Sequence, residues 1–158
     1  MDNIYNNLVK LSKNKIFYKN FSLKDCFSTR LKLIFIHLAF LLINLKKKDK
    51  KISQKLFDHT FVQIERNLRE IGFGDTSINK EMKKNINYFY HILLECEKFS
   101  LLSLKNKKIF FIKYFDELDG KNDHLIALFV NYFDKFHIFS LQLSLNSIIK
   151  GNINFIYK

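Results

Sequence analysis

Apolar residues recur along much of the chain at intervals of three and four positions, a spacing that places them on one side of an α-helix. The clearest line of this kind, here called a seam, is Phe57, Phe61, Ile64, Leu68 and Ile71. A second seam is Ile78, Met82, Ile86, Phe89, Leu93 and Cys96. Two consecutive seams predict helices that pack against each other through their apolar faces.

The same pattern predicts an all-α fold, a single compact multi-helix domain of about six or seven helices over residues 1–158. Proline is absent and glycine occurs four times, which argues against many short strands joined by frequent turns. No repeat or flexible linker divides the chain. Expected helical ranges are 3–18, 28–47, 57–71, 78–102, 123–140 and 143–149, the last ending at Gly151. Residues 109–115, IFFIKYF, fit a short helix or a strand, and 152–158 are expected to be extended or frayed.

The most apolar stretch, residues 33–45, reads LIFIHLAFLLINL and is thirteen residues long. A membrane-spanning helix needs about 20 apolar residues, so we expect a buried core helix in which His37 is a hydrogen-bonded core residue. The run KKKDKK at 46–51 follows directly and leaves peripheral contact with acidic lipid headgroups open. Residues 123–140 hold more apolar surface than one helix face can bury, and either an exposed patch or complete burial fits this excess.

The net charge of +12 favours an acidic partner such as nucleic acid, a ribosome or an anionic membrane. Frequent Lys, Asn, Ile and Phe are also typical of an AT-rich genome, so solvated lysines explain the charge equally well. Cys26 and Cys96 lie far apart in apolar surroundings, and we expect both to be core residues and not a disulfide. A protein with two such cysteines is expected in a reducing compartment. The start, MDNIYNN, resembles neither a secretory signal nor a transit peptide, which favours a cytoplasmic location.

Patterns that would indicate a metal, a cofactor or an enzyme are missing from the sequence. The five histidines show no HxxxH or HExxH spacing, neither cysteine belongs to a CxxC pair, and no GxSxG or P-loop occurs. Residues Gly72 to Gly74 follow a helix, and Ser77 stands where a nucleotide-binding loop would need a third glycine. We therefore expect no metal, no cofactor and no catalytic residue, and a small helical enzyme whose site follows none of these patterns stays open as a third possibility.

The segment REIGFGDTSINK, residues 69–80, contains two of the four glycines. We expect Gly72 to end one helix in a left-handed conformation, Gly74 to allow a second bend, and Ser77 to cap the next helix. These three residues would form a structural turn between antiparallel helices. Asp75 is expected near the helix start, where it can meet free amides or pair with Arg69 or Lys80.

Several lysines, arginines and tyrosines flank this turn, and Asn87 and His91 lie on the same face of the expected helix as the lysines. Lysines can neutralise phosphates and aromatic rings can stack on bases, so a basic helical module that binds RNA or the ribosome is an alternative function. No helix-turn-helix, RRM or KH signature is present, which argues against recognition of a specific DNA or RNA sequence.

Several segments together resemble the ubiquinol-cytochrome c chaperone family, assembly factors of the cytochrome bc complex. They are LIFIHLAFLL, LFDHTFVQIERNLREIGFGDTSINKEMKK and NYFYHIL, and the resemblance is best over 33–150. It implies a helical, non-enzymatic chaperone that binds nascent or assembling cytochrome b, with contact to the ribosome exit region open and a location peripheral to the inner membrane. Eight residues belong to the matching motif and lie off the apolar seams, so we expect them to bind the partner. They are Arg66, Arg69, Asp75, Lys80, Lys83, Lys84, Tyr88 and Tyr90.

Overall fold

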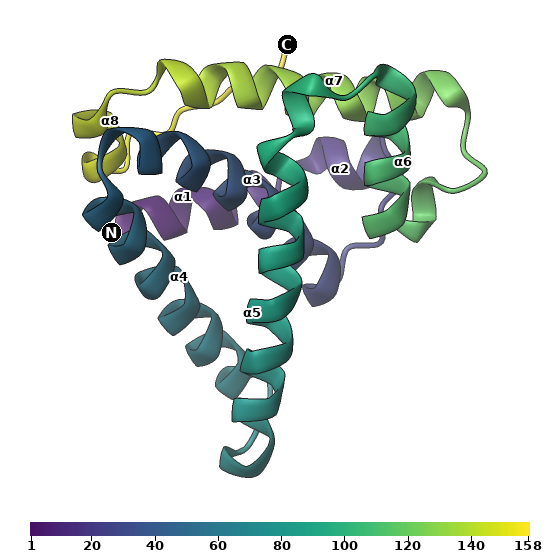
Figure 1. The fold of residues 1–158 in the computed structure, drawn as a ribbon. Coiled ribbons are helices and arrows are strands. Elements are labelled where there is room, and N and C mark those ends of the chain that lie inside the picture. The colour runs from purple at the N-terminus through teal and green to yellow at the C-terminus, as the bar shows by residue number, and fades with distance from the viewer.

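The computed structural model describes residues 1–158 as an all-α molecule, which confirms the predicted fold class (Figure 1). Six helices have 11 residues or more and two are shorter. The α-helices are α1 (Asp2–Ser12), α2 (Lys15–Lys19), α3 (Phe27–Lys48), α4 (Lys50–Glu70), α5 (Asp75–Glu97), α6 (Leu104–Tyr114), α7 (Asp123–Gln142) and α8 (Leu145–Lys150). Short 3₁₀ turns occupy Phe99–Leu101 and Asp116–Leu118.

Helix α3 lies at the centre of the molecule, in contact with α1, α4, α5 and α7. Every residue from Leu33 to Leu42 is buried, which confirms the predicted core helix. It is also the one helix long and apolar enough to cross a bilayer, yet 78% of its most apolar window is buried inside the protein. Burial on all sides explains why this helix lacks a polar face.

His37 supplies the main polar contact within this apolar centre. Its Nδ1–H donates to the Leu33 carbonyl at 2.6 Å, and Nε2 accepts from the Tyr132 hydroxyl at 3.0 Å. Because the ring is fully buried, the charged form is disfavoured and the pKa of His37 is lowered to about 4. The expected hydrogen-bonded core histidine is confirmed, and it joins α3 to α7.

Helices α4 and α5 meet at a narrow corner that projects from the body of the molecule (Figure 1). The amides of Gly72 and Phe73 donate to the Arg69 and Leu68 carbonyls, both at 3.1 Å, and Gly72 has a φ of +113°. These contacts form a Schellman motif, in which glycine avoids the strain that a side chain would bring. The predicted role of Gly72 is confirmed.

The cap assigned to Ser77 is wrong, because α5 begins at Asp75 with Gly74 as its N-cap. The backbone of Gly74 is extended, with a φ of −86° and a ψ of 174°, a conformation open to any residue. Ser77 instead lies inside the first turn, where its hydroxyl donates to the Gly74 carbonyl at 3.3 Å.

Ile71, predicted to end the seam of α4, lies outside the helix and is 54% exposed.

Three other boundaries differ from the prediction for local reasons. The first helix breaks near Asn14, whose side chain accepts from the Ile16 amide at 3.1 Å and starts α2. Helix α5 ends at Glu97, and a separate 3₁₀ turn completes the expected range. The ambiguous stretch 109–115 belongs mostly to α6, whose N-cap Ser103 accepts from the Asn106 amide at 3.2 Å.

The apolar excess of α7 is largely covered. Phe111 on α6 packs on Phe129 and Phe133, with ring centroids 5.0 and 4.9 Å apart. The irregular C-terminal segment covers another side, where Phe155 lies 5.2 Å from Phe136. Of the two readings left open by the sequence, burial therefore accounts for most of this helix, although Ile138 and Leu141 stay exposed.

The two corner glycines should respond differently to the same substitution. Gly72→Ser should lower the free energy of unfolding by about 1–2 kcal/mol, because serine is strained at this positive φ. Gly74→Ser should be neutral or stabilising by about a few tenths of a kcal/mol, because a Cβ there meets nothing and the hydroxyl can cap α5. Urea denaturation of both variants measures the difference, and an equal loss in both would contradict this description of the corner.

Acid should destabilise the protein through His37. Its pKa rises from about 4 in the folded state to its ordinary value of 6.5 on unfolding. At pH values between these two pKa values, the unfolded state therefore binds more protons than the folded state. Lowering the pH from about 7 to about 4.5 should cost about 2–3 kcal/mol through this group. Urea titrations should show a shallower pH dependence for His37→Gln than for the wild type; parallel curves would contradict the assignment.

Candidate functional site: the flank of α5 and an apolar groove

Arg69 is the centre of a charged group at the α4–α5 corner. Its guanidinium lies 3.1 Å from Glu65, one helical turn earlier, and 2.6 Å from Asp75 at the start of α5. All three side chains are exposed by more than a third, so solvent limits each pair to about 0–1 kcal/mol. The pairing expected for Asp75 is thus made by Arg69, and it links the two helices across the turn.

The remaining predicted residues do not form one continuous surface. Tyr88 and Tyr90 are two positions apart on α5, so they point about 160° away from each other around the helix axis. Tyr88 is half-buried against Phe35 and Tyr114, and with Lys84 it lines a shallow pocket of 200 Å³ between α3 and α5. Tyr90 faces α4.

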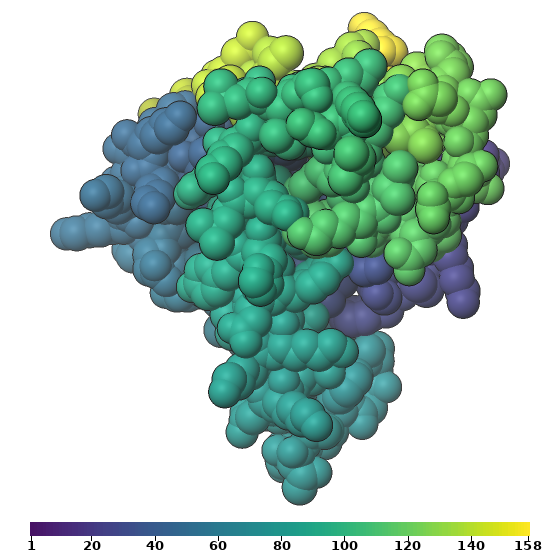
Figure 2. All heavy atoms as spheres, turned by 45° about the vertical axis from the view of Figure 1, so that its right-hand side comes forward, coloured from purple at the N-terminus to yellow at the C-terminus, as the bar shows by residue number.

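Besides Arg69, all four predicted basic side chains are exposed, and that of Lys84 is 74% exposed. Lys80 and Lys83 are exposed on the side of α5 that faces away from α3, and Arg66 is exposed on α4. Figure 2 shows α5 lying uncovered on one face of the molecule from the body down to the corner. The structure therefore brings Arg69 and Asp75 together, and it distributes the other six predicted residues over three different sides of α4 and α5.

A groove, called here the α4–α5 groove, lies where these two helices diverge over the C-terminal half of α3. Its volume is 310 Å³, and it is lined by Leu42, Ile43, Lys46, Lys50, Ser53, Gln54, Phe57, Tyr90, Leu93 and Glu97. The ring of Tyr90 stacks on Phe57, with centroids 5.7 Å apart and planes at 27°. Tyr90 is 47% exposed, and Leu94, which lies one turn further along α5 and outside the groove lining, is 60% exposed. Accessible apolar surface of this kind is suited to holding an apolar segment of another polypeptide.

Charge is unevenly distributed around the α4–α5 groove. Lys46 and Lys50 stand on the side formed by α3 and α4, while Glu97 stands on the side of α5. None of the three makes an ion pair within the protein. A bound helix would meet cations at one edge, where the negative end of its dipole or a carboxylate is stabilised.

The sequence interpretation included Tyr90 but missed most of this groove. Phe57 was assigned to a core seam, although it is only partly buried and forms one wall. Leu94 was overlooked, yet it follows Tyr90 at a spacing of four, outside the seam of its own helix. The spacing of Tyr90 and Leu94, outside the seam, indicates an exposed apolar strip along α5.

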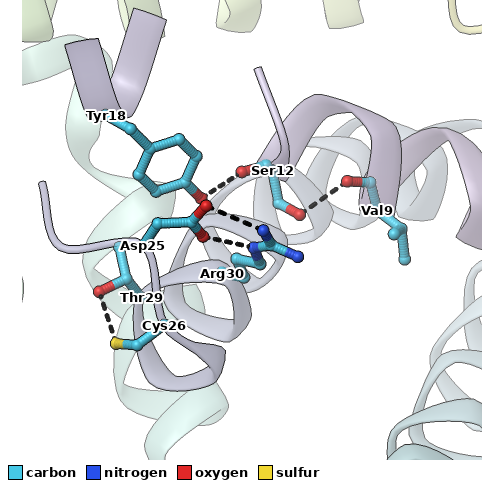
Figure 3. Close-up of polar contacts among 7 residues, drawn as sticks. All are labelled: Val9, Ser12, Tyr18, Asp25, Cys26, Thr29 and Arg30. Carbon is cyan, nitrogen blue, oxygen red and sulfur yellow. Dashed lines mark hydrogen bonds and ion pairs between the residues drawn. The ribbon is translucent and has the colours of Figure 1, made fainter. Parts of the chain in front are cut away.

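A separate polar cluster surrounds the start of α3 (Figure 3). Arg30 binds Asp25 through two hydrogen bonds of 2.7 and 3.0 Å, and Cys26 Sγ lies 3.3 Å from Thr29 Oγ1. The contact with Thr29 lowers the pKa of the Cys26 thiol. Cys26 is partly exposed at the N-cap position, so its predicted place in the core is wrong, whereas Cys96 is buried as predicted.

Neither cysteine has a histidine among its hydrogen-bond partners, and no three side chains of His, Cys, Asp or Glu are clustered as a metal site would need. The accessible features of the molecule are an apolar groove and charged helix flanks. Such accessible features suit the binding of another polypeptide.

Comparison with known proteins identifies the group to which it belongs. The family model described as "Ubiquinol-cytochrome C chaperone" matches residues 19–101, so the chain belongs to this chaperone family and the predicted resemblance is confirmed. The match starts and ends earlier than the expected 33–150. It includes α3, α4 and α5, and therefore the whole α4–α5 groove. Membership in a chaperone family implies a non-enzymatic role.

A solved structure, the crystal structure of the Cbp3 homolog from Brucella abortus, resembles this one with a TM-score of 0.81. The alignment covers 98% of this chain and 87% of that chain at 19% sequence identity, so it shows a shared fold. Comparison with curated proteins gives no significant match.

Proposed function

We propose that the protein is an assembly chaperone that binds newly made cytochrome b and supports assembly of the ubiquinol-cytochrome c reductase complex. The family supports the class of protein, and the α4–α5 groove is the observation that supports the mode of action. A newly made membrane protein presents long apolar segments, and an accessible apolar groove can shield part of one of them. Chaperone action of this kind requires binding alone.

The dimensions of the groove suggest how much of a client it holds. A volume of 310 Å³ suits a few side chains from one face of a helix, as in other helix-in-groove interactions. Phe57, Tyr90 and Leu93 would contact the apolar face of the client, and Lys46 and Lys50 would meet a carboxylate or the carboxyl end of its helix. The client would remain partly exposed and could pass readily to its next partner.

The charged flank of the corner is proposed as a second contact. Arg66, Lys80 and Lys83 are exposed and free of ion pairs. Lys84 is also exposed, and its one ion pair, with Glu81 on the same helix, is long at 3.7 Å. A cationic helix flank suits an acidic surface such as the ribosome exit region, where cytochrome b emerges. The corresponding location is the cytoplasm, peripheral to the inner membrane.

Variants of the groove provide the direct test. The groove pair replaces by serine Tyr90, which lines the groove, and Leu94, which is exposed one turn further along α5, outside the lining. Both side chains are largely accessible, so the fold should persist while client affinity falls about 10- to 100-fold. The matched control is the pair Ile109→Ser and Leu128→Ser, which are exposed side chains on α6 and α7. The amount of assembled complex, measured by native gel and by cytochrome b absorbance in cells, should fall for the groove pair only. Wild-type assembly with the groove pair would rule out this site.

The charged flank is tested by reversing its sign. Arg69→Glu with Lys84→Glu should lower the amount of assembled complex without loss of helical content, because solvent keeps each ion pair of Arg69 weak and the Lys84 side chain is 74% exposed. The salt dependence of captured material then separates the two classes of partner. Apolar capture of cytochrome b should persist at high ionic strength, whereas binding to RNA through phosphates falls steeply with salt. Recovery of ribosomal RNA without cytochrome b would favour the alternative, a basic RNA-binding module.

A further inference from the structure

The bend between α3 and α4 carries an unusually dense group of uncompensated positive charges. Six lysines and one carboxylate, Asp49, lie between residues 46 and 55, and all six lysine side chains are exposed. Asp49 is occupied as the N-cap of α4, where it accepts from the Ile52 amide at 3.0 Å. None of the six lysines forms an ion pair, although Lys48 Nζ donates to the Leu143 carbonyl.

The other lysine-rich run behaves differently, so composition alone does not explain this group. In α6, Lys107 pairs with Asp134 and Lys108 with Asp123, each at 2.7 Å, and both lysine side chains are only 15% exposed. Folding therefore neutralises much of that run internally. It leaves the charges of the α3–α4 bend directed at solvent.

Two exposed aliphatic residues lie near the bend. The contact from Lys48 to Leu143 and the hydrogen bond of 2.6 Å from Asn44 to Ser140 hold the end of α7 beside the end of α3. Leu141 is 47% exposed there, and Ile149 on the following helix α8 is 42% exposed. Figure 1 shows α8 beside the α3–α4 bend. We call this end of the molecule the basic pole; it comprises Lys46, Lys47, Lys50, Lys51, Lys55, Lys150, Leu141 and Ile149.

We propose that the basic pole attaches the protein to the surface of an anionic lipid bilayer. Each lysine near such a surface is attracted by the negative potential of the leaflet, and nearby aliphatic side chains can enter the headgroup region. A nucleic acid fits less well, because the pole has no arginine, and the only exposed aromatic ring close to it, Tyr90, is stacked on Phe57. The apolar stretch of α3 remains inside the protein, so the attachment is peripheral.

The same contact would orient the molecule. Lys46 and Lys50 belong to the basic pole and also line the α4–α5 groove, so the groove would open at the membrane plane. The glycine corner lies at the opposite end of α4, about 30 Å away along the helix axis. This orientation rests on the proposed chaperone function, since it places the groove where a membrane protein is inserted; attachment to the bilayer itself needs no client.

Sedimentation of the purified protein with vesicles tests the attachment. Vesicles containing phosphatidylglycerol should bind the protein, and vesicles of phosphatidylcholine alone should not. A variant with Lys46, Lys47, Lys50 and Lys51 changed to Gln should bind the anionic vesicles about 100- to 1,000-fold more weakly. The control carries the same charge change at Lys15, Lys19, Lys24 and Lys121, which are exposed and make no ion pair, and it should lose much less. Equal losses in the two variants, or no binding by the wild type, would overturn the proposal.

The absence of tryptophan from the chain allows a second test of the contact surface. A single tryptophan introduced as Ile149→Trp should shift its fluorescence to the blue when anionic vesicles are added, because the ring leaves water. Ile71→Trp, at the exposed corner on the opposite end of α4, should show no shift. A shift at position 71 alone, or lysine-dependent binding to polyuridylate without binding to vesicles, would contradict a lipid-facing pole. Both assays omit the client, so they can fail while the chaperone function stands.

Discussion

The burial of α3 is the constraint on which the rest of the structure depends. Ten consecutive buried residues, Leu33 to Leu42, leave this helix without a polar side, so it is stable in water only when other helices enclose it. Helices α1, α4, α5 and α7 provide that enclosure. The hydrogen bond from Tyr132 to His37 fixes α7 on α3, because an unpaired polar group in this position would be costly.

The enclosure is incomplete where α4 and α5 diverge from their glycine corner. The two helices are held together at the corner and spread apart over the C-terminal half of α3, which leaves a groove that no other element fills. The stacked rings of Phe57 and Tyr90 join α4 to α5 at the side of the groove nearest the corner. The same geometry places Lys46 and Lys50 at its edge. A protein that must surround one apolar helix thus gains a second, accessible apolar surface, which is the property that the proposed chaperone function requires.

The fold could be predicted from the sequence because its main signals are strong and local. The seams of α4 and α5 and the apolar run of α3 are set by residue spacing, and Gly72 is required by a positive φ. The site was harder to predict. Tyr88 and Tyr90 are close in sequence but face different neighbours, and the burial of α7 by Phe155 depends on contacts between distant segments. Ser77 is not the cap because Gly74 occupies that position, and local preference does not separate two candidates three residues apart.

Hydrogen exchange of backbone amides, with and without anionic vesicles, tests the central role of α3 most directly. Amides between Leu33 and Leu42 should exchange more slowly than those of any other segment in water, at rates that reflect global unfolding. Their protection should be unchanged when vesicles are added, because α3 is already enclosed by protein. Rapid exchange of α3 in water, with protection appearing only in the presence of lipid, would show that this helix is a membrane segment and would contradict the account.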